Sequence, residues 1–237
     1  MDERIFRKGV ACLKKANLNF WADSGTLLGL IRDGGIIPWD GDFDLAVWDH
    51  ETTEETVIKA FDPEEFLAVS LIPYGIKGIH FLPRDERLQG FLDIIFYTKR
   101  GNRAIHQSCA TKDTLWTNLL MRIERFQNPH IYAKEKYKRL HEKASHKGLL
   151  SRVKNRLERA LDHLMFLNYL NGIQLTYDFP AHYFENLRPV TFLGVEVNIP
   201  ADAESYLELA YGKDWRTPKQ WTHWWEGATY IDGKKNI

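Results

Sequence analysis

The sequence is poor in cysteine: its 237 residues include only Cys12 and Cys109. Two cysteines exclude a scaffold of several disulfides, and their spacing is not that of a zinc site. The chain has no apolar run near the roughly 18 residues that suggest a membrane span. Charges are scattered through its first residues, which excludes the apolar core of a signal peptide. We therefore expect a cytoplasmic protein without a transmembrane segment.

Net charge is also absent, because 32 Lys and Arg balance 32 Asp and Glu. Bulk charge therefore gives no indication of a nucleic-acid partner. The charges are unevenly distributed: residues 40–65 hold ten acidic residues and one lysine, whereas residues 122–159 hold twelve Lys or Arg and four Glu. The basic segment predicts either a solvated helical face or peripheral contact with an anionic acceptor or membrane surface.

Apolar residues recur at helical spacing in some segments and at alternate positions in others. Helices are predicted over residues 3–17, 24–32, 53–62, 113–171 and 201–212, with Ser24 as the N-cap of the second. Strands are predicted over 17–22, 42–48, 67–72, 78–83 and 90–98, and a β-hairpin over 190–200. The pattern indicates an α+β or α/β-like fold. We expect one domain over 1–237, with a core at about 1–110, a helical basic segment at about 113–171 and a closing segment at about 180–237.

Two carboxylates stand on alternate positions of a predicted strand. Asp42 and Asp44 therefore project from the same face, while the residues between and after them face the core. Neighbouring carboxylates repel each other unless a cation lies between them, and oxygen ligands suit Mg²⁺ or Mn²⁺. Two such residues alone would equally fit an exposed acidic strand end. Asp93 is the expected third ligand, because it is a lone carboxylate in a very apolar strand.

A second candidate feature precedes these carboxylates, where a predicted strand meets a predicted helix. Gly25 has no side chain, so phosphate oxygens can approach the free N–H groups and the positive dipole at the helix start. Ser24 and Thr26 flank it, and Thr26 adds a hydroxyl. Arg32 follows about two turns later and can offer a bidentate fork to a phosphate. A tight turn and a surface cation are the alternative readings of Gly25 and Arg32.

Together these motifs resemble the LicD family, which includes fukutin and fukutin-related protein. The resemblance is carried by GTLLG from Gly25, by Arg32, by IPWD ending at Asp40, by DFD from Asp42, by Asp93 with Ile94, and by IPADAESYLELAYGKDW before Pro218. It covers roughly residues 18–98 and 190–220. The sequence departs from the family pattern at Gly41, where many members have Asp or His.

The resemblance implies a nucleotidyltransferase-like core, in which a small mixed sheet is flanked by helices and the carboxylates lie at one sheet edge. It also implies an activity. Such a protein would move phosphocholine, ribitol phosphate or glycerol phosphate from a CDP-activated alcohol to a hydroxyl of a glycan or glycolipid, releasing CMP.

The resemblance assigns roles to individual residues as well. Asp42, Asp44 and Asp93 would hold Mg²⁺ or Mn²⁺, and Asp93 would also take the hydroxyl proton. Asp40 would either contact these ligands without binding the metal or fix the loop. Ser24, Gly25, Thr26 and Arg32 would bind the donor. Lys77 and Lys213 are further candidates for substrate binding, although a solvated strand and a helix end would account for them as well.

Two other functions share parts of this pattern. A D-x-D glycosyltransferase that uses a nucleotide sugar would need a longer nucleotide-binding half than the 41 residues before Asp42. A non-catalytic glycan-binding module would be expected to lose one of Asp42, Asp44 and Asp93. The sequence therefore favours the metal-dependent phosphotransferase.

Overall fold

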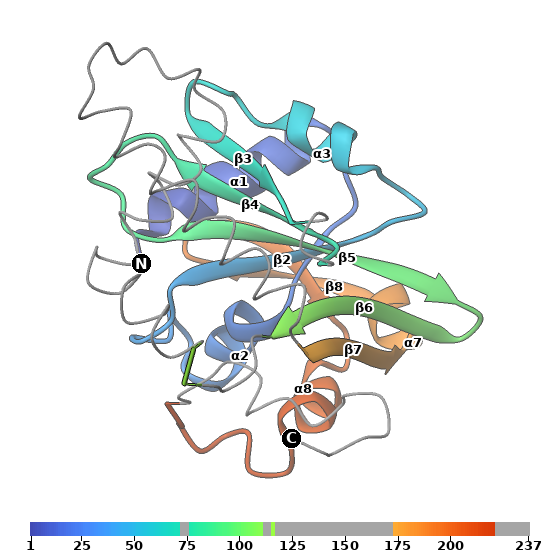
Figure 1. Ribbon diagram of the computed structural model, residues 1–237. Helices are drawn as coiled ribbons and strands as arrows, with labels where there is room; N and C mark the ends of the chain where they lie inside the picture. Colours follow the sequence, from blue (N-terminus) through green and yellow to red (C-terminus); the bar gives the residue numbers. More distant parts are fainter. Residues whose placement is uncertain (72–75, 111–114, 117–172, 221–237) are drawn as a thin grey trace. The chain divides into compact units, whose positions relative to one another are not determined.

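The structure is a computed structural model that describes residues 1–71, 76–110, 115–116 and 173–220 (Figure 1). The chain divides into two compact units. The larger consists of Met1–Ile72, Ile76–Ser108 and Leu175–Ile237, and the smaller of Pro73–Gly75 and Cys109–Gln174. The predicted helical segment 113–171 and its basic run 122–159 lie almost wholly outside the described residues. The elements that position the carboxylates all belong to the larger unit.

A seven-stranded mixed sheet forms the centre of this unit. Its strands are β1 (Trp21–Ala22), β2 (Asp42–Trp48), β3 (Phe66–Ser70), β4 (Gly78–Pro83), β5 (Phe91–Arg100), β6 (Arg103–Ala110) and β7 (Ile173–Pro180). Five of them follow the order β1-β2-β5-β4-β3, and β6 pairs with β5 and β7. Strands β2 and β5 run parallel, whereas β1–β2, β3–β4, β4–β5 and β5–β6 are antiparallel.

The parallel pair decides where the candidate residues meet. A parallel connection needs a crossover of a dozen or more residues, and here α3 (Glu54–Ala60), β3 and β4 supply it. Because β2 and β5 point the same way, their first residues lie at the same sheet edge. In the observed register Asp42 is opposite Phe91 and Asp44 is opposite Asp93.

Helices and a hairpin cover the sheet. They are α1 (Glu3–Lys15), α2 (Ser24–Arg32), α3, α7 (His182–Glu185) and α8 (Ala203–Tyr211), with β8 (Leu187–Phe192) and β9 (Val195–Pro200) forming the hairpin. Helix α1 packs on β5, α3 and β9, whereas α2 packs on β2 and α8. Figure 1 shows α2 and α8 below β2, with α1 and α3 near β3 and β4. The predicted α+β fold, with a mixed sheet flanked by helices, is confirmed.

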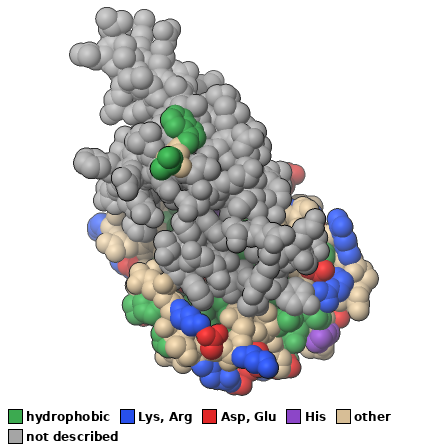
Figure 2. All heavy atoms as spheres, turned by 60° about the horizontal axis from the view of Figure 1, so that its bottom comes forward, with side chains coloured by type: hydrophobic (Ala, Val, Ile, Leu, Met, Phe, Trp, Pro, Cys, Tyr) green, Lys and Arg blue, Asp and Glu red, His purple; other side chains and the backbone are tan. Residues whose placement is uncertain are grey.

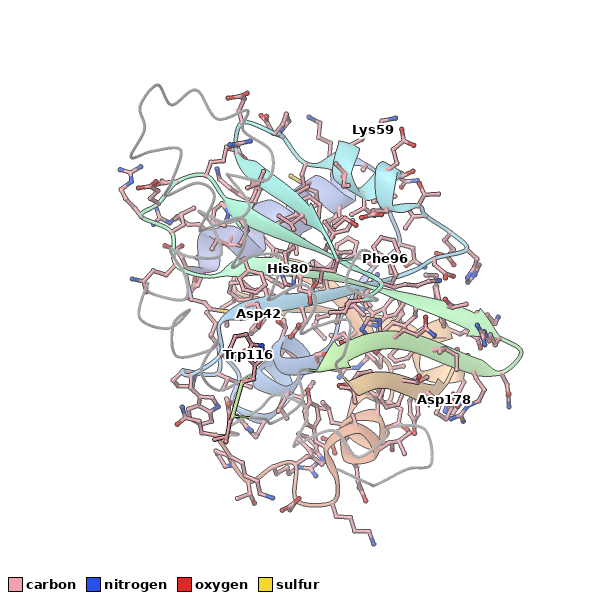
Figure 3. The ribbon with its side chains drawn as sticks, viewed as in Figure 1. Asp42, Lys59, His80, Phe96, Trp116 and Asp178 are labelled. Carbon is pink, nitrogen blue, oxygen red and sulfur yellow. The ribbon has the colours of Figure 1, made fainter. Side chains whose placement is uncertain are left out.

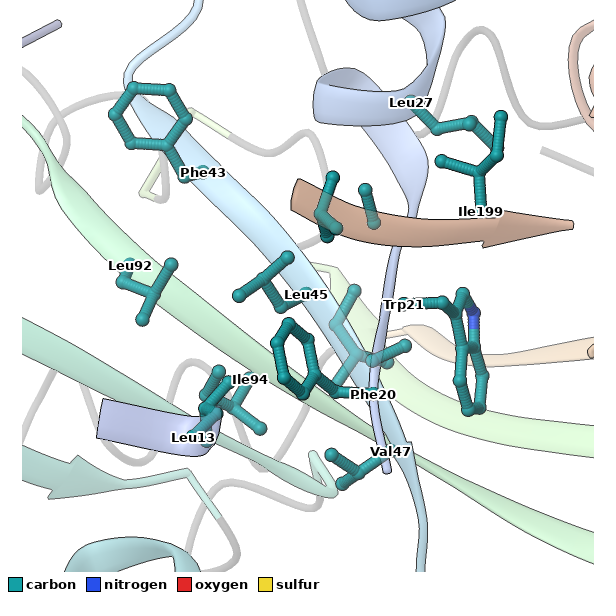
Figure 4. Packing of buried hydrophobic residues seen from close by; sticks show 14 of the residues in the cluster. Leu13, Phe20, Trp21, Leu27, Phe43, Leu45, Val47, Leu92, Ile94 and Ile199 are labelled. Carbon is teal, nitrogen blue, oxygen red and sulfur yellow. The ribbon is translucent and has the colours of Figure 1, made fainter. Parts of the chain in front are cut away.

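The core explains why β2 can carry carboxylates at all. Phe43, Leu45 and Val47 alternate along the strand and are almost fully buried, so they anchor β2 by one face. Figure 4 shows Leu45 and Val47 beside Leu13 of α1 and Ile94 of β5. This apolar anchorage leaves the opposite face of the strand start for Asp42 and Asp44.

The sequence misplaces some local details. Ser24 is not the N-cap of α2: Asp23 holds that position with extended backbone, and Ser24 is the first helical residue with φ 44°. Strands β6 and β7 and the short helix α7 were not predicted. None of the described helices has the length and apolarity that a membrane crossing requires.

Candidate functional site

Three aspartates gather where the loop after α2 enters β2. Asp42 and Asp44 lie on β2, and Asp40 lies two residues before it. One carboxylate oxygen from each of the three can be chosen so that all lie within 4.8 Å of one another. Figure 3 shows Asp42 close to His80, with Phe96 farther along the sheet. The described part of the chain thus brings together three oxygen donors of the kind that hard cations prefer.

Asp44 is held by the start of α2. Its Oδ2 accepts hydrogen bonds from the backbone N–H groups of Gly25 (2.9 Å) and Thr26 (3.3 Å). Its own N–H donates to Thr26 Oγ1 at 2.8 Å. Two of the N–H groups that a helix start leaves unpaired are therefore satisfied by a carboxylate from a neighbouring strand. The free N–H groups that the sequence analysis expected for a phosphate are, in this structure, bonded to Asp44.

Gly25 is essential to this arrangement for a different reason from the expected one. A Cβ atom built on Gly25 would lie 2.3 Å from Asp40 Oδ2 and 3.3 Å from Asp44 Oδ2. Any side chain here would therefore displace the Asp40 carboxylate. The glycine makes room for the cluster of aspartates itself.

Asp93 stands next to the cluster on β5. It is paired with Asp44 in the parallel register and with His80 in the antiparallel one, and laterally paired residues project from the same sheet face. Asp93 Oδ2 lies 3.8 Å from His80 Nε2, while Oδ1 is buried and has no hydrogen-bond partner among the described residues. Such an unpaired buried carboxylate oxygen is costly, and a bound cation would satisfy it.

The pKa values of Asp40, Asp42, Asp44 and Asp93 also fit a cation-binding site. Burial raises the pKa of Asp40, Asp42, Asp44 and Asp93, that of Asp93 to about 7. For Asp42 and Asp44, the charges of neighbouring aspartates raise the pKa further. Among the described residues, no lysine or arginine forms an ion pair with any of the four. The site accumulates negative charge that a divalent cation would neutralise.

A fifth aspartate lies directly behind the cluster. Asp23, fully buried at the N-cap of α2, accepts hydrogen bonds from Tyr97 Oη (2.8 Å) and Tyr206 Oη (2.6 Å). Burial raises its pKa, and the bonds from the two hydroxyls oppose that shift. Burial raises the pKa of Tyr211 of α8, and the charges of Asp44 and Asp23 raise it further. Helix α8 therefore reaches the site from the far end of the sequence.

This geometry lies within a segment that matches a known family. Residues 17–117 match the model described as the nucleotidyltransferase domain of LicD/FKTN/FKRP. This part of the chain is therefore similar to the LicD family. The mixed sheet with its flanking helices is consistent with the nucleotidyltransferase-like core that the sequence predicts, and the matched segment contains the three clustered carboxylates and Asp93.

Individual relatives match either over a short stretch or at low sequence identity. The chain is 46% identical over 39 residues to ribitol 5-phosphate transferase FKRP of Homo sapiens, covering 16% of this chain and 8% of that protein. It is 22% identical over 231 residues to ribitol-5-phosphate transferase FKTN of Mus musculus, covering 93% and 36%. An uncharacterized protein of Rickettsia prowazekii is 27% identical over 127 residues, covering 53% and 42%. The chain thus spans less than half the length of the curated relatives that it matches.

Some expected binding residues of the LicD segment are engaged elsewhere. Arg32 Nε and Nη2 donate to the two carboxylate oxygens of Asp33, at 2.8 and 2.7 Å. Lys77 Nζ lies 2.8 Å from Asp49 Oδ2, just beyond the far end of β2. Seven residues of strand separate Asp49 from Asp42, which corresponds to about 23 Å. The structure therefore does not bring Lys77 to the carboxylates.

Lys213 lies two residues beyond α8 and is exposed. Figure 2 turns the α8 end of the molecule forward and shows basic and acidic side chains next to one another on its described surface. Near Lys213 in the sequence, Arg216 forms an ion pair with Glu204 and Lys219 forms one with Asp214. A substrate-binding role for Lys213 stays a prediction.

Sequence reasoning underestimated two groups. Asp40 was expected to fix a loop, yet it joins Asp42 and Asp44 within the 4.8 Å cluster, whereas Asp93 does not. Asp23 was not considered at all. Its position one residue before the predicted helix was visible, but its partners Tyr97 and Tyr206 lie 74 and 183 residues away.

Proposed function

We propose that this LicD-type chain is a metal-dependent phosphotransferase. It would move a phospho-alcohol group from a CDP-linked donor to a hydroxyl of a glycan or glycolipid, releasing CMP. The observation that carries the proposal is the cluster of Asp40, Asp42 and Asp44 beside Asp93, within the segment that matches the LicD model. The relatives named as ribitol phosphate transferases make ribitol phosphate the first group to test.

The side chains fit a divalent cation of the Mg²⁺ or Mn²⁺ kind. Only oxygen donors converge, their pKa values are raised in the absence of positive charge, and Asp93 Oδ1 has no partner among the described residues. When bound, such a cation would offset charge on the donor pyrophosphate and on the departing CMP. Asp42, Asp44 and Asp93 remain the proposed ligands, and the geometry adds Asp40 to them.

The protein's own residues have separate roles in the proposed reaction. The N–H groups of Gly25 and Thr26 fix the Asp44 carboxylate before any substrate arrives, so little reorganisation is needed. Asp93, which stands beside the cluster on β5, is proposed to accept the proton of the acceptor hydroxyl. As that oxygen bonds to the distal phosphorus of the donor, the phosphorus–oxygen bond to CMP breaks. Neighbouring His80 remains neutral, because burial lowers its pKa to about 4.

Donor binding by Ser24, Gly25, Thr26, Arg32 and Lys213 stays part of this proposal. The bonds from Gly25 and Thr26 to Asp44 support an indirect role for the turn, acting through the carboxylate. Contact of residues 122–159 with an anionic acceptor or a membrane surface stays a prediction as well, since that segment lies outside the described residues.

A release assay tests the proposed function. The protein is incubated with CDP-ribitol, CDP-choline or CDP-glycerol, with and without Mg²⁺, and free CMP is measured, with water as the surrogate acceptor. We expect release from one of these donors, abolished by a chelator and restored by Mg²⁺. A parallel series with nucleotide sugars identifies the rival activity. Release of nucleoside diphosphate from a sugar donor, with no CMP from any CDP-alcohol, would overturn the proposal in favour of a glycosyltransferase.

A further inference from the structure

One turn holds the side chain of Asp44. Its side chain accepts hydrogen bonds from the N–H groups of Gly25 and Thr26, and its N–H donates to Thr26 Oγ1. Its carbonyl oxygen accepts from the N–H of Asp23 at 3.2 Å. Four hydrogen bonds therefore connect this single residue to residues 23–26. Whatever fixes the turn also fixes the Asp44 carboxylate.

The turn is not held by its local sequence alone. Asp23 has no side-chain capping bond to α2, and Ser24 has φ 44°, in the left-handed region that non-glycine residues avoid. Such a conformation persists only where surrounding structure enforces it. Besides the four bonds to Asp44, two tyrosine hydroxyls hold the turn: Tyr97 at 2.8 Å and Tyr206 at 2.6 Å bond to different oxygens of Asp23.

The two tyrosines are themselves fixed by packing. The Tyr206 ring lies 5.1 Å from that of Phe179 and 5.0 Å from that of Phe184. The Tyr97 ring lies 4.7 Å from Phe184 as well. Rings packed in this way leave the hydroxyls little freedom, so they act as fixed donors from β5 and α8.

We propose that Asp23, Tyr97 and Tyr206 are positioning residues, which fix the turn at 23–26 and thereby aim the Asp44 carboxylate at the cation. The proposal rests on the proposed function in one respect, namely that Asp44 binds a divalent cation. The inference goes beyond the proposed function because it gives one residue of β5 and one of α8 a role in metal binding, although neither residue touches the metal or the substrate. Loss of a group that orients a metal ligand, without touching the metal, typically weakens metal binding by about 10- to 100-fold.

The test removes single hydroxyl groups. Tyr97→Phe, Tyr206→Phe and the double variant each keep the ring and its packing. Tyr183→Phe is the matched control, because its ring lies 5.7 Å from that of Tyr206 while its hydroxyl is not a partner of Asp23 among the described residues. For each protein, Mn²⁺ affinity is measured by titration of the metal alone, and the unfolding temperature of the metal-free form is recorded.

We expect each variant of Tyr97 or Tyr206 to bind Mn²⁺ about 10-fold more weakly, and the double variant more weakly still. The control should stay within about 2-fold of the wild type, because its hydroxyl does not touch the turn. Excess Mn²⁺ should restore CMP release by the single variants. Wild-type Mn²⁺ affinity in Tyr97→Phe and Tyr206→Phe would overturn the inference, even if the unfolding temperature fell, because the tyrosines would then be merely structural.

The metal titration needs no donor, so the two proposals can fail separately. If the wild type binds Mn²⁺ and the variants lose affinity, but no CDP-alcohol is cleaved, the positioning role stands and the transferase proposal falls. If CMP is released and the variants keep their Mn²⁺ affinity, the transferase proposal stands and the positioning role falls. A wild type that binds no Mn²⁺ would overturn both.

Discussion

Just beyond the end of strand β2, Asp49 is surrounded by partners. Lys77 Nζ lies 2.8 Å from its carboxylate and 2.9 Å from the Thr98 hydroxyl, which also donates to Asp49. At the start of the same strand, Asp42 and Asp44 have no lysine or arginine partner in the described part of the chain. Instead they face other carboxylates and the helix start. One strand therefore carries a compensated acidic group at one end and an uncompensated cluster at the other.

The difference shows how to tell a structural carboxylate from a ligand-ready one. A charge that already has a cationic partner has little to gain from a metal ion. A group of carboxylates that raise one another's pKa gains a great deal. Asp44 and Asp49 are the same residue type on or next to the same strand, so the difference between them lies in the side chains that surround each carboxylate.

The largest effect should separate the two ends directly. Asp44→Asn should reduce CMP release by more than about 100-fold, because a neutral amide is a poor ligand for the cation. The fold should be kept, because the amide oxygen can still accept hydrogen bonds from the α2 N–H groups. Asp49→Asn should leave release unchanged and lower the free energy of unfolding by about 1 kcal/mol. CMP assays and urea unfolding of both variants provide the measurement. Equal losses of activity in the two variants would contradict the comparison.

A smaller but still large effect is expected from the turn. Gly25→Ala places a Cβ atom against Asp40 Oδ2 and should weaken Mg²⁺ binding and CMP release by about 10- to 100-fold. Gly35→Ala is the control, because a Cβ atom there meets nothing within 4 Å. If Gly25→Ala binds Mg²⁺ as the wild type does, Asp40 does not belong to the site.

The carboxylates at the start of β2 should also make the free energy of unfolding depend on pH. The raised pKa values of Asp42, Asp44 and Asp93, the last about 7, mean that the native metal-free protein binds more protons than the unfolded chain above about pH 4. Stability should therefore fall as pH rises through 7. Mg²⁺ at about 100 times its Kd should add about 2.7 kcal/mol at pH 8 and much less at pH 5, where protons compete.

Thermal unfolding at both pH values, with and without Mg²⁺, measures this effect. Asp44→Asn is the appropriate control, since it removes one of the mutually repelling charges and should reduce the Mg²⁺ response. A Mg²⁺ response of the same size at pH 5 and pH 8 would show that the cluster does not bind the cation.

The smallest effect concerns the compensated end. Lys77→Met should cost no more than about 1 kcal/mol of stability, because the pair with Asp49 is partly exposed. CMP release and the KM for the donor should stay at their wild-type values. A raised KM in this variant would instead support the sequence-based prediction that Lys77 binds substrate.

The sequence predicted those parts of the fold that a local pattern specifies. Strand β2 was predicted over residues 42–48 and β4 over 78–83, which are their observed bounds. Alternating apolar residues mark the buried face of β2, and a short apolar run marks β4, which is buried on both faces. Strand β6 (RAIHQSCA) mixes apolar and polar residues and gave no such signal. The N-cap of α2 was wrong for a physical reason: Asp44, eighteen residues from Thr26, takes over the bonds that a local cap would make.

The candidate site was predictable only in part for a similar reason. Asp42 and Asp44 follow from a period of two, so the sequence alone places them on one face. The nearness of Asp93 depends on a parallel register across a long crossover, and that of Asp40 depends on the space above Gly25. The tyrosine donors to Asp23 depend on the final packing of the whole unit, which no window of sequence contains.

The bond between Tyr206 and Asp23 spans 183 residues, and this separation has a consequence for biosynthesis. At roughly 5–20 residues per second, translation needs about 10–40 s to proceed from one partner to the other. A nascent chain therefore carries the complete DFD motif long before the helix that supplies the second tyrosine exists. During that interval the motif is synthesised but its geometry is unfinished, because the bond from Tyr206 to Asp23 can form only after residue 206 has been added.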